Sequence, residues 1–176
     1  MKGIVIYKSK YGSAKKYAHW IAKETGFQCI DVDKVSIKTV QDYDTVIVGG
    51  GVYASGVPAF SFLKKHIDQL AGKKILTYCC GASPFDQKFF DELYGKIFTD
   101  KLAKIPCYYC RGAFDMKNMT FKDRTLCKML RKMVAKKDPS TYEVWEEAIM
   151  SVGEDEAGDW TDPSYILPIL EAINRN

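Results

Sequence analysis

Lys2–Lys16 has the sequence KGIVIYKSKYGSAKK, and this stretch decides the fold. Its apolar run Gly3–Tyr7 predicts a buried β-strand, Ser9–Ala14 predicts a turn, and a helix is expected to follow. A strand that ends in such a turn directs the unpaired backbone N–H groups of the next helix toward one point. The helix dipole favours an anion at the same point, so the stretch predicts a strand, a phosphate-binding turn and a helix in succession.

The residues of the turn separate it from two common nucleotide-binding loops. Ser9 and Ser13 offer hydroxyl donors, and Gly12 allows the backbone to approach a ligand closely. The spacing matches neither the Gly-x-x-x-x-Gly-Lys-Ser/Thr loop of nucleoside triphosphate sites nor the Gly-x-Gly-x-x-Gly loop of dinucleotide sites. Two interpretations stay open from this turn alone: a site for another phosphate, or a strand-to-helix turn without a ligand.

The composition is that of a globular chain with a single domain, residues 1–176. Of its 176 residues 47% are hydrophobic, and the formal net charge is +4. A chain of this length can bury a substantial core without disulfide bonds. No run of eighteen uncharged apolar residues occurs, so we expect neither a signal peptide nor a transmembrane helix. The six cysteines lack the density of a secreted disulfide scaffold, which predicts a cytoplasmic protein with reduced thiols.

Apolar runs rich in β-branched and aromatic residues alternate with helical patterns along the chain. The runs are 4–7, 27–32, 45–48, 74–80 and 105–110, and the expected helices are about 13–24, 58–70, 84–98 and 162–173. This alternation predicts an α/β fold in which a parallel sheet is covered on both faces. Five strands in this rhythm predict the doubly wound order 2-1-3-4-5, with a ligand at the carboxyl ends of the strands.

The turn after the first strand resembles the phosphate loop of flavodoxins, which holds the phosphate of FMN. Members of that family usually carry Ser or Thr at the positions of Ser9, Tyr11 and Ala14. This chain keeps Ser9, together with Gly12 between the other two positions. Ser13, the Tyr11 hydroxyl, Lys10 and Lys15 are candidates to replace the two missing hydroxyl groups.

The whole chain resembles the flavodoxin-domain family that contains the menaquinone-dependent protoporphyrinogen IX dehydrogenases of bacteria. Shared stretches are Gly3–Tyr7 with the loop behind it, Tyr43–Gly49, Ala59-Phe60, and Arg111–Ala113 followed by a long insertion. The resemblance implies FMN as the cofactor and chemistry that belongs to the flavin rather than to a catalytic side chain. It also implies protoporphyrinogen IX as the electron donor and a quinone as the acceptor.

Three loops are expected to converge at the switch point between the first and third strands: 9–14, 49–58 and 80–85. In the second loop, glycines would let backbone amides approach a flat ring, and Tyr53 could stack on it. The third loop would offer backbone donors to the pyrimidine edge of the flavin. Tight turn geometry alone is the alternative explanation for both loops.

These loops supply the candidate FMN contacts. The expected contact residues are Ser9, Lys10, Tyr11, Gly12, Ser13, Ala14, Lys15, Gly50, Gly51, Val52, Tyr53, Cys80, Gly81, Ala82 and Ser83. The pattern shows no Ser-His-Asp arrangement, and no side chain is assigned as a general base. We expect no metal site, and no nucleic acid among the partners.

A long segment, about 114–161, is inserted between the fifth strand and the last helix. Its first half, 117–137, predicts a basic amphipathic helix. Such a helix can lie on an anionic membrane surface, and the protein would then be peripheral at the inner face of the membrane. One stripe of this helix holds Leu126, Met129, Leu130, Met133 and Val134, while Lys128, Arg131, Lys132 and Lys136 face elsewhere. A carboxylate-bearing porphyrin is a second candidate partner. The alternative is a helix that packs its Leu and Met side chains on the domain and leaves its lysines in solvent.

The second half of the insertion, Glu143–Asp159, is acidic. It predicts a short helix at about 142–150 and then a flexible loop through Gly153 and Gly158. Trp145 and Trp160 are candidates to anchor the segment to the domain or to cover the flavin.

Cys107 and Cys110 have the Cys-x-x-Cys spacing of redox pairs and of half a zinc site. They lie in a predicted strand, where residues three apart point to opposite faces of the sheet. No second pair of cysteines or histidines completes a metal site, so a structural role is favoured.

Two other functions stay open from the sequence. A small electron carrier would share the fold and the cofactor, although such flavodoxins are usually acidic and this chain has a net charge of +4. An interaction module that has lost FMN would share only the fold, and Tyr11 and Ala14 are its best support.

Overall fold

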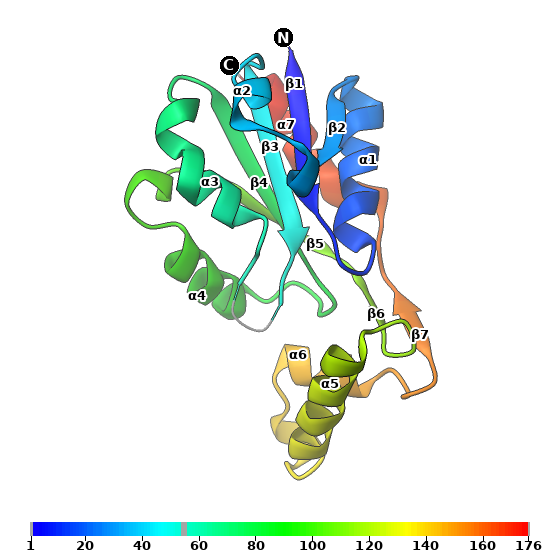
Figure 1. Cartoon of the computed structure of the whole chain (residues 1–176). Helices are drawn as coiled ribbons and strands as arrows, with labels where there is room; N and C mark the ends of the chain where they lie inside the picture. Colours follow the sequence, from blue (N-terminus) through cyan, green and yellow to red (C-terminus); the bar gives the residue numbers. More distant parts are fainter. Residues whose placement is uncertain (1, 54–55, 176) are drawn as a thin grey trace.

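The computed structural model describes residues 2–53 and 56–175 and contains a five-stranded parallel sheet of order β2-β1-β3-β4-β5. This confirms the predicted α/β fold and strand order. All five strands end at the same edge, which faces downward in Figure 1, toward α5 and α6. The strands are β1 (Gly3–Lys8), β2 (Gln28–Asp31), β3 (Thr45–Gly51), β4 (Lys74–Gly81) and β5 (Cys107–Arg111).

Helices cover both faces of the sheet, as the alternating pattern predicts (Figure 1). On one face lie α1 (Ser13–Thr25) and α7 (Leu167–Asn174), and on the other lie α2 (Ile37–Val40), α3 (Phe60–His66) and α4 (Gln87–Ile97). The expected helix 58–70 is divided, since α3 gives way to a 3-10 turn over Ile67–Leu70. The C-cap of α1 is Gly26 with φ of 72°, and its backbone N–H bonds the Ala22 carbonyl at 2.9 Å.

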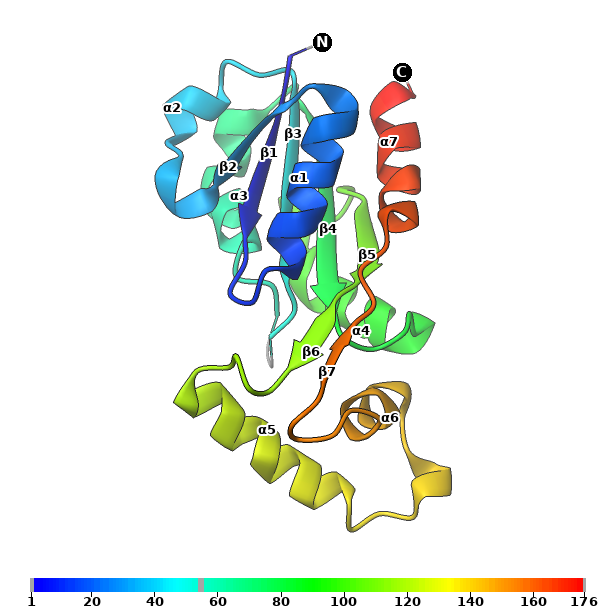
Figure 2. The ribbon, with the colours of Figure 1, turned by 90° about the vertical axis from the view of Figure 1, so that its right-hand side faces the viewer.

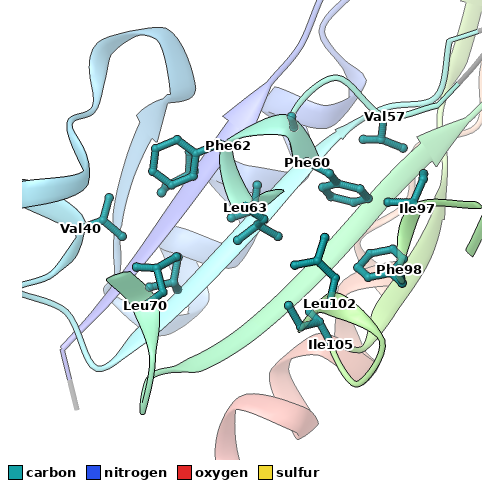
Figure 3. Packing of buried hydrophobic residues seen from close by; sticks show 14 of the residues in the cluster. Val40, Val57, Phe60, Phe62, Leu63, Leu70, Ile97, Phe98, Leu102 and Ile105 are labelled. Atoms are coloured by element: carbon teal, nitrogen blue, oxygen red, sulfur yellow. The ribbon is translucent and has the colours of Figure 1, made fainter. Parts of the chain in front are cut away.

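The larger core lies between the sheet on one side and helices α3 and α4 on the other (Figure 3). Phe60 and Leu63 of α3 pack there with Phe98 and Leu102, which follow α4. The second core lies under α1 and α7. Cys107 packs against the first core and Cys110 belongs to the second, so the two thiols lie on opposite faces as predicted.

Strand β3 continues through Gly49, Gly50 and Gly51, which the sequence had suggested to be a loop. Packing requires these glycines: a Cβ on Gly49 would lie 1.9 Å from a ring carbon of Tyr78, and a Cβ on Gly50 would lie 2.8 Å from that of Ala59. Close packing therefore accounts for the glycines at both positions, and the approach of a flat ring to this segment stays a prediction. Real Cβ contacts do not occur at such distances, so these residues stay glycine for reasons of the core.

The insertion folds into its own small unit beyond the carboxyl edge of the sheet (Figure 2). Two short antiparallel strands, β6 (Ala113–Asp115) and β7 (Ala157–Asp159), form its neck. Between them lie α5 (Phe121–Val134) and α6 (Val144–Met150). The two helices were expected, whereas the neck was not: β7 occupies the end of the segment predicted as a flexible loop.

Helix α5 packs with a face that differs from the predicted one. Cys127 and Val134 point into the unit, while Leu126 and Met129 are 53% and 58% exposed. Arg131 also points inward, because its guanidinium donates to the carbonyls of Ile149 and Val152, the latter at 2.6 Å. The alternative in which the Leu and Met side chains pack on the domain is therefore wrong.

The acidic half of the insertion is held by hydrogen bonds rather than by a large core. Glu146 is only 1% exposed; it accepts from Lys137 Nζ and from the Glu143 backbone N–H at 3.0 Å. These bonds lower the pKa of Glu146, with the Lys137 bond as the largest cause. Across residues 2–53 and 56–175, every helix is too short or too polar to cross a bilayer.

Candidate cofactor-binding site

The turn between β1 and α1 has the geometry of an anion cradle. Gly12 caps α1 with φ of 101°, and its N–H donates to the Ser9 hydroxyl oxygen at 3.1 Å. A Cβ on Gly12 would meet nothing within 4 Å. Backbone conformation and not space therefore requires glycine here, because an L side chain rarely adopts this φ.

The first backbone N–H groups of α1 point away from any acceptor. Within the described part of the chain, those of Ser13, Ala14 and Lys15 have no hydrogen-bond partner, whereas that of Lys16 bonds the Gly12 carbonyl at 2.9 Å. The side chain of Lys15 is exposed and has no ion-pair partner among the same residues. Three converging donors, the helix dipole and one cation make this turn suited to an anion such as phosphate.

The three predicted loops are bonded to one another. Lys10 N–H donates to the Tyr53 hydroxyl at 3.1 Å, which joins the first loop to the second. Val52 N–H donates to the Cys80 carbonyl at 2.8 Å, which joins the second to the third. The first and third loops meet through Gly112 and Ala113. Ala113 N–H, at the start of β6, donates to the Ser13 hydroxyl at 3.1 Å, and Gly112 N–H donates to the Gly81 carbonyl at 2.7 Å. The predicted residues therefore form one cluster at the carboxyl edge, at the switch point between β1 and β3.

The third loop is fixed through its carbonyl groups. Gly81 accepts from Gly112 N–H at 2.7 Å, Ala82 accepts from Arg111 Nε at 3.2 Å, and Ser83 accepts from the Tyr109 hydroxyl at 2.7 Å. The N–H groups of Ala82 and Ser83 have no acceptor among the residues that the structure describes. The loop thus presents donors while β5 holds its acceptors, which is the arrangement expected for contact with the polar edge of a flat ring.

Tyr53 lies half-buried between the first two loops. Its ring meets that of Tyr11 edge to face, with centroids 6.4 Å apart and planes at 66°. Burial raises the pKa of Tyr53, and the hydrogen bond from Lys10 N–H acts in the opposite direction. The phenol is therefore neutral near pH 7 and is available for stacking and hydrogen bonding. Ala54 and Ser55, which belong to the predicted loop, lie outside the described residues.

Some predicted contact residues have other roles for their side chains. Ala14 and Cys80 are 2% and 5% exposed and belong to the core under α1. Ser13 already accepts from Ala113, as described above. Ala14 and Cys80 can therefore offer a ligand only their backbone, whereas the Ser13 hydroxyl accepts from Ala113 and keeps its own O–H as a donor. Gly50 and Gly51 are buried strand residues, and a Cβ on Gly51 would lie 2.7 Å from the Tyr53 hydroxyl oxygen.

Lys10 and Tyr11 reach from the turn to the insertion. Both Lys10 Nζ and the Tyr11 hydroxyl contact one carboxylate oxygen of Asp123, in the first turn of α5. Thr120 N–H also donates to the Tyr11 hydroxyl, at 3.3 Å. The Lys10 bond is the largest cause that lowers the pKa of Asp123, and the same bond raises the pKa of Lys10. We call this group, Lys10, Tyr11, Asp123 and Thr120, the turn–insertion contact.

Sequence reasoning missed two residues of this region, Asp123 and Arg111. Arg111 lies over the Trp160 ring, with 4.4 Å from its Cζ to the ring centroid, and bonds the third loop. Asp123 is separated from Lys10 by 113 positions, so no local pattern joins them. The available signal was Tyr11 itself, because a long side chain at a position usually held by Ser or Thr can reach a distant segment.

Two surface clefts, each of about 390 Å³, lie beside the loop cluster. One is lined by Lys8, Pro58 and residues of α2 and α3, and the other by Phe85, Tyr109 and residues near α7. Neither is lined by the turn Ser9–Lys15. No group of three or more His, Cys, Asp or Glu side chains suited to a metal occurs in the described ranges 2–53 and 56–175.

The chain is similar to several known proteins. An uncharacterised protein of Methanocaldococcus jannaschii is 28% identical over 116 residues, which are 64% of this chain and 76% of that protein. The two-electron reduced flavodoxin of Megasphaera elsdenii is 14% identical, with a TM-score of 0.47, over 61% of this chain and 84% of its own. General stress protein 14 of Treponema denticola, solved in complex with FMN, is 14% identical, with a TM-score of 0.42, over 64% of this chain and 87% of its own.

A family model supplies the assignment. The flavodoxin domain model matches residues 4–141, which include the three loops, α5 and the five strands of the sheet except Gly3, the first residue of β1. This match covers more than half of the chain. The protein therefore belongs to the flavodoxin domain family.

Proposed function

We propose that the loop cluster binds FMN and that the protein is an FMN-dependent oxidoreductase or electron-transfer protein. The observation that carries the proposal is the α1 N-terminus, where the backbone N–H groups of Ser13, Ala14 and Lys15 have no acceptor among the described residues and the Lys15 side chain is exposed. Membership of the flavodoxin domain family supports the same cofactor.

The residues present suit each part of FMN. The turn Ser9–Lys15 would hold the phosphate through backbone N–H groups and the Ser9 hydroxyl. Tyr53 would pack against the ring, and the N–H groups of Ala82 and Ser83 would bond its polar edge. Bound FMN supplies the electron transfer, so the chain's own residues bind and orient the ring rather than act as acids or bases.

The experiment compares two substitutions of nearly equal shape at Ser9. Both Ser9→Asp and Ser9→Asn keep an oxygen that can accept from Gly12 N–H, but only aspartate places a negative charge beside the phosphate. We expect FMN affinity, measured by quenching of flavin fluorescence, to fall at least about tenfold in Ser9→Asp relative to Ser9→Asn. Riboflavin, which has no phosphate, should bind both variants equally. Equal FMN affinity in the two variants would place the phosphate elsewhere.

Within this class we propose a porphyrinogen as the electron donor and a quinone as the acceptor. The support is the folded insertion beyond the carboxyl edge of the sheet (Figure 2), whose helix α5 carries lysines and exposed apolar side chains and contacts the first loop through Asp123. The direct test follows the fluorescence of the porphyrin that forms when FMN-loaded protein, protoporphyrinogen IX and menadione are mixed without oxygen. Porphyrin formation that requires both protein and quinone supports the proposal; a rate equal to that without protein rejects it.

The electron-carrier alternative differs in its partner and not in its cofactor. A carrier would retain FMN and exchange electrons with redox proteins while leaving protoporphyrinogen unoxidised. Charge argues against a carrier, since such flavodoxins are usually acidic, whereas this chain has a net charge of +4 and a long insertion whose first half is basic. The interaction-module alternative predicts a colourless protein after loading with FMN and gel filtration, because no flavin would remain bound.

A further inference from the structure

We infer that α5 is a surface for anionic lipid, on which the protein rests through one apolar row flanked by lysines. The row consists of Leu126, Met129, Leu130 and Met133, which are 53%, 58%, 36% and 65% exposed. Phe121, 87% exposed, begins the same helix outside the row. Four large apolar side chains on one side of a 14-residue helix form a patch of the kind that marks an interaction surface.

The inner face of α5 is already satisfied by the insertion. Cys127 packs against the core of the unit, Arg124 Nε donates to the Met116 carbonyl at 2.8 Å, and Arg131 bonds Ile149 and Val152. The apolar row is therefore not a displaced part of this core. Figure 2 shows α5 at the end of the molecule opposite both termini. The main domain therefore leaves room for a flat partner on the side of α5 that faces away from the sheet.

Charge decides which partner suits the row. Residues 117–137 contain eight Lys or Arg and one acidic residue, Asp123, which is engaged by Lys10 and Tyr11. Of the eight, Lys128 and Lys137 pair with Glu154 and Glu146, and the two arginines bond backbone carbonyls. Lys122, Lys132 and Lys136 are exposed beside the apolar row. A second copy of the chain docking through α5 would bring two sets of lysines together, whereas anionic headgroups neutralise them.

The length of α5 suits a helix that lies on a membrane surface. Fourteen residues span about 21 Å, which is shorter than the hydrocarbon core of a bilayer. Its exposed apolar row and flanking lysines are what an interfacial helix needs: apolar side chains enter the acyl boundary while lysines stay at the headgroups.

The test is sedimentation with vesicles of equal phosphatidylglycerol and phosphatidylcholine, at low salt and without added FMN. The variant Leu126→Glu/Met129→Glu changes the row, and Leu167→Glu is a matched control because Leu167, on α7, is 55% exposed. We expect the wild type and the control to bind alike and the double variant to bind at least about tenfold less. Equal binding of all three proteins, or none by the wild type, would overturn the inference.

Two double variants that replace lysines by glutamates complete the test. Lys132→Glu/Lys136→Glu should bind at least about fivefold less, while Lys23→Glu/Lys64→Glu, on α1 and α3, should bind as the wild type does. Circular dichroism should show the same melting temperature in each pair, since all these side chains are exposed. Sedimentation velocity gives the competing outcome: a lipid-free dimer that dissociates in Leu126→Glu/Met129→Glu would assign the row to a second copy and overturn the lipid assignment.

Discussion

The sheet with its helices and the inserted unit differ in how they treat their apolar side chains. Ile47 of β3 and Leu63 of α3 are fully buried between the sheet and its helices. In the insertion, a small core of Phe114, Met116 and Val152 is supplemented by arginine and ion-pair contacts, while the apolar row of α5 faces solvent. The difference predicts that the sheet carries most of the stability, and it leaves apolar surface exposed on the insertion, as the lipid proposal requires.

The largest expected effect separates two leucines. Leu63→Ala removes a fully buried side chain and should lower the free energy of unfolding by about 2–5 kcal/mol. Leu126→Ala removes an equal volume from the exposed row and should change it by less than about 0.5 kcal/mol. Urea denaturation monitored by circular dichroism measures both. Similar losses in the two variants would mean that the row of α5 is buried in solution.

The next effect tests how the insertion holds itself together. Arg131→Ala leaves two carbonyl groups without their donor and should destabilise the α5–α6 unit by about 1–3 kcal/mol. The neighbouring exposed Lys132→Ala is the matched control. Hydrogen exchange followed by mass spectrometry should show faster exchange in α5 and α6 for Arg131→Ala only, with the sheet unchanged. Faster exchange in the sheet as well would join the two regions into one cooperative unit.

As the pH falls, the insertion should lose its folded structure at a higher pH than the sheet does. The pKa values of Asp123, Glu146 and Glu154 are lowered, each mainly by a bond to a lysine. A carboxyl whose folded pKa is lowered contributes stability above its unfolded pKa, and that contribution is lost as the pH falls through the folded value. The usual values are 3.8 for aspartate and 4.5 for glutamate, so the loss should occur below about pH 4.5.

Tryptophan fluorescence can follow this release. A Trp20→Phe variant leaves Trp145 and Trp160 as reporters, and both lie in the insertion or at its end. We expect their emission to shift to the red as the pH falls, while far-ultraviolet circular dichroism keeps most of its signal. A single transition shared by both signals would contradict the comparison.

The smallest effect concerns the turn–insertion contact. Asp123→Asn removes a negative charge from Lys10 and Tyr11, so FMN affinity should rise about threefold while riboflavin affinity stays constant. Asp155→Asn, an exposed position of the insertion, is the control. Fluorescence titration with both flavins measures the change. Lower FMN affinity in Asp123→Asn would show instead that the contact holds the turn in its binding geometry.

The sequence predicted the sheet well because its signals are local. The alternation of apolar runs and helices determined the strand order, and Gly12 marked the sharp turn at the site. The glycines of β3 were misassigned because a loop and a closely packed strand end use the same residue. Their true cause, the ring of Tyr78 against Gly49, comes from the neighbouring strand β4.

The insertion was predicted less completely because its contacts are distant or polar. Helical spacing gave α5 and α6, but a helix with two candidate faces does not reveal which one is buried. Arg131 decides this by bonding carbonyls of a later segment. The neck β6–β7 joins three-residue strands that are more than forty positions apart, too short to give a pattern. The turn–insertion contact likewise depends on tertiary structure.

The most direct test of the central claim is a calorimetric comparison of FMN and riboflavin binding to the wild-type protein. The two ligands share the ring and differ in the phosphate, so their affinity ratio reports the contribution of the α1 N-terminus. The account predicts at least about tenfold tighter binding of FMN. Equal affinities for the two flavins, or no binding of either, would contradict it.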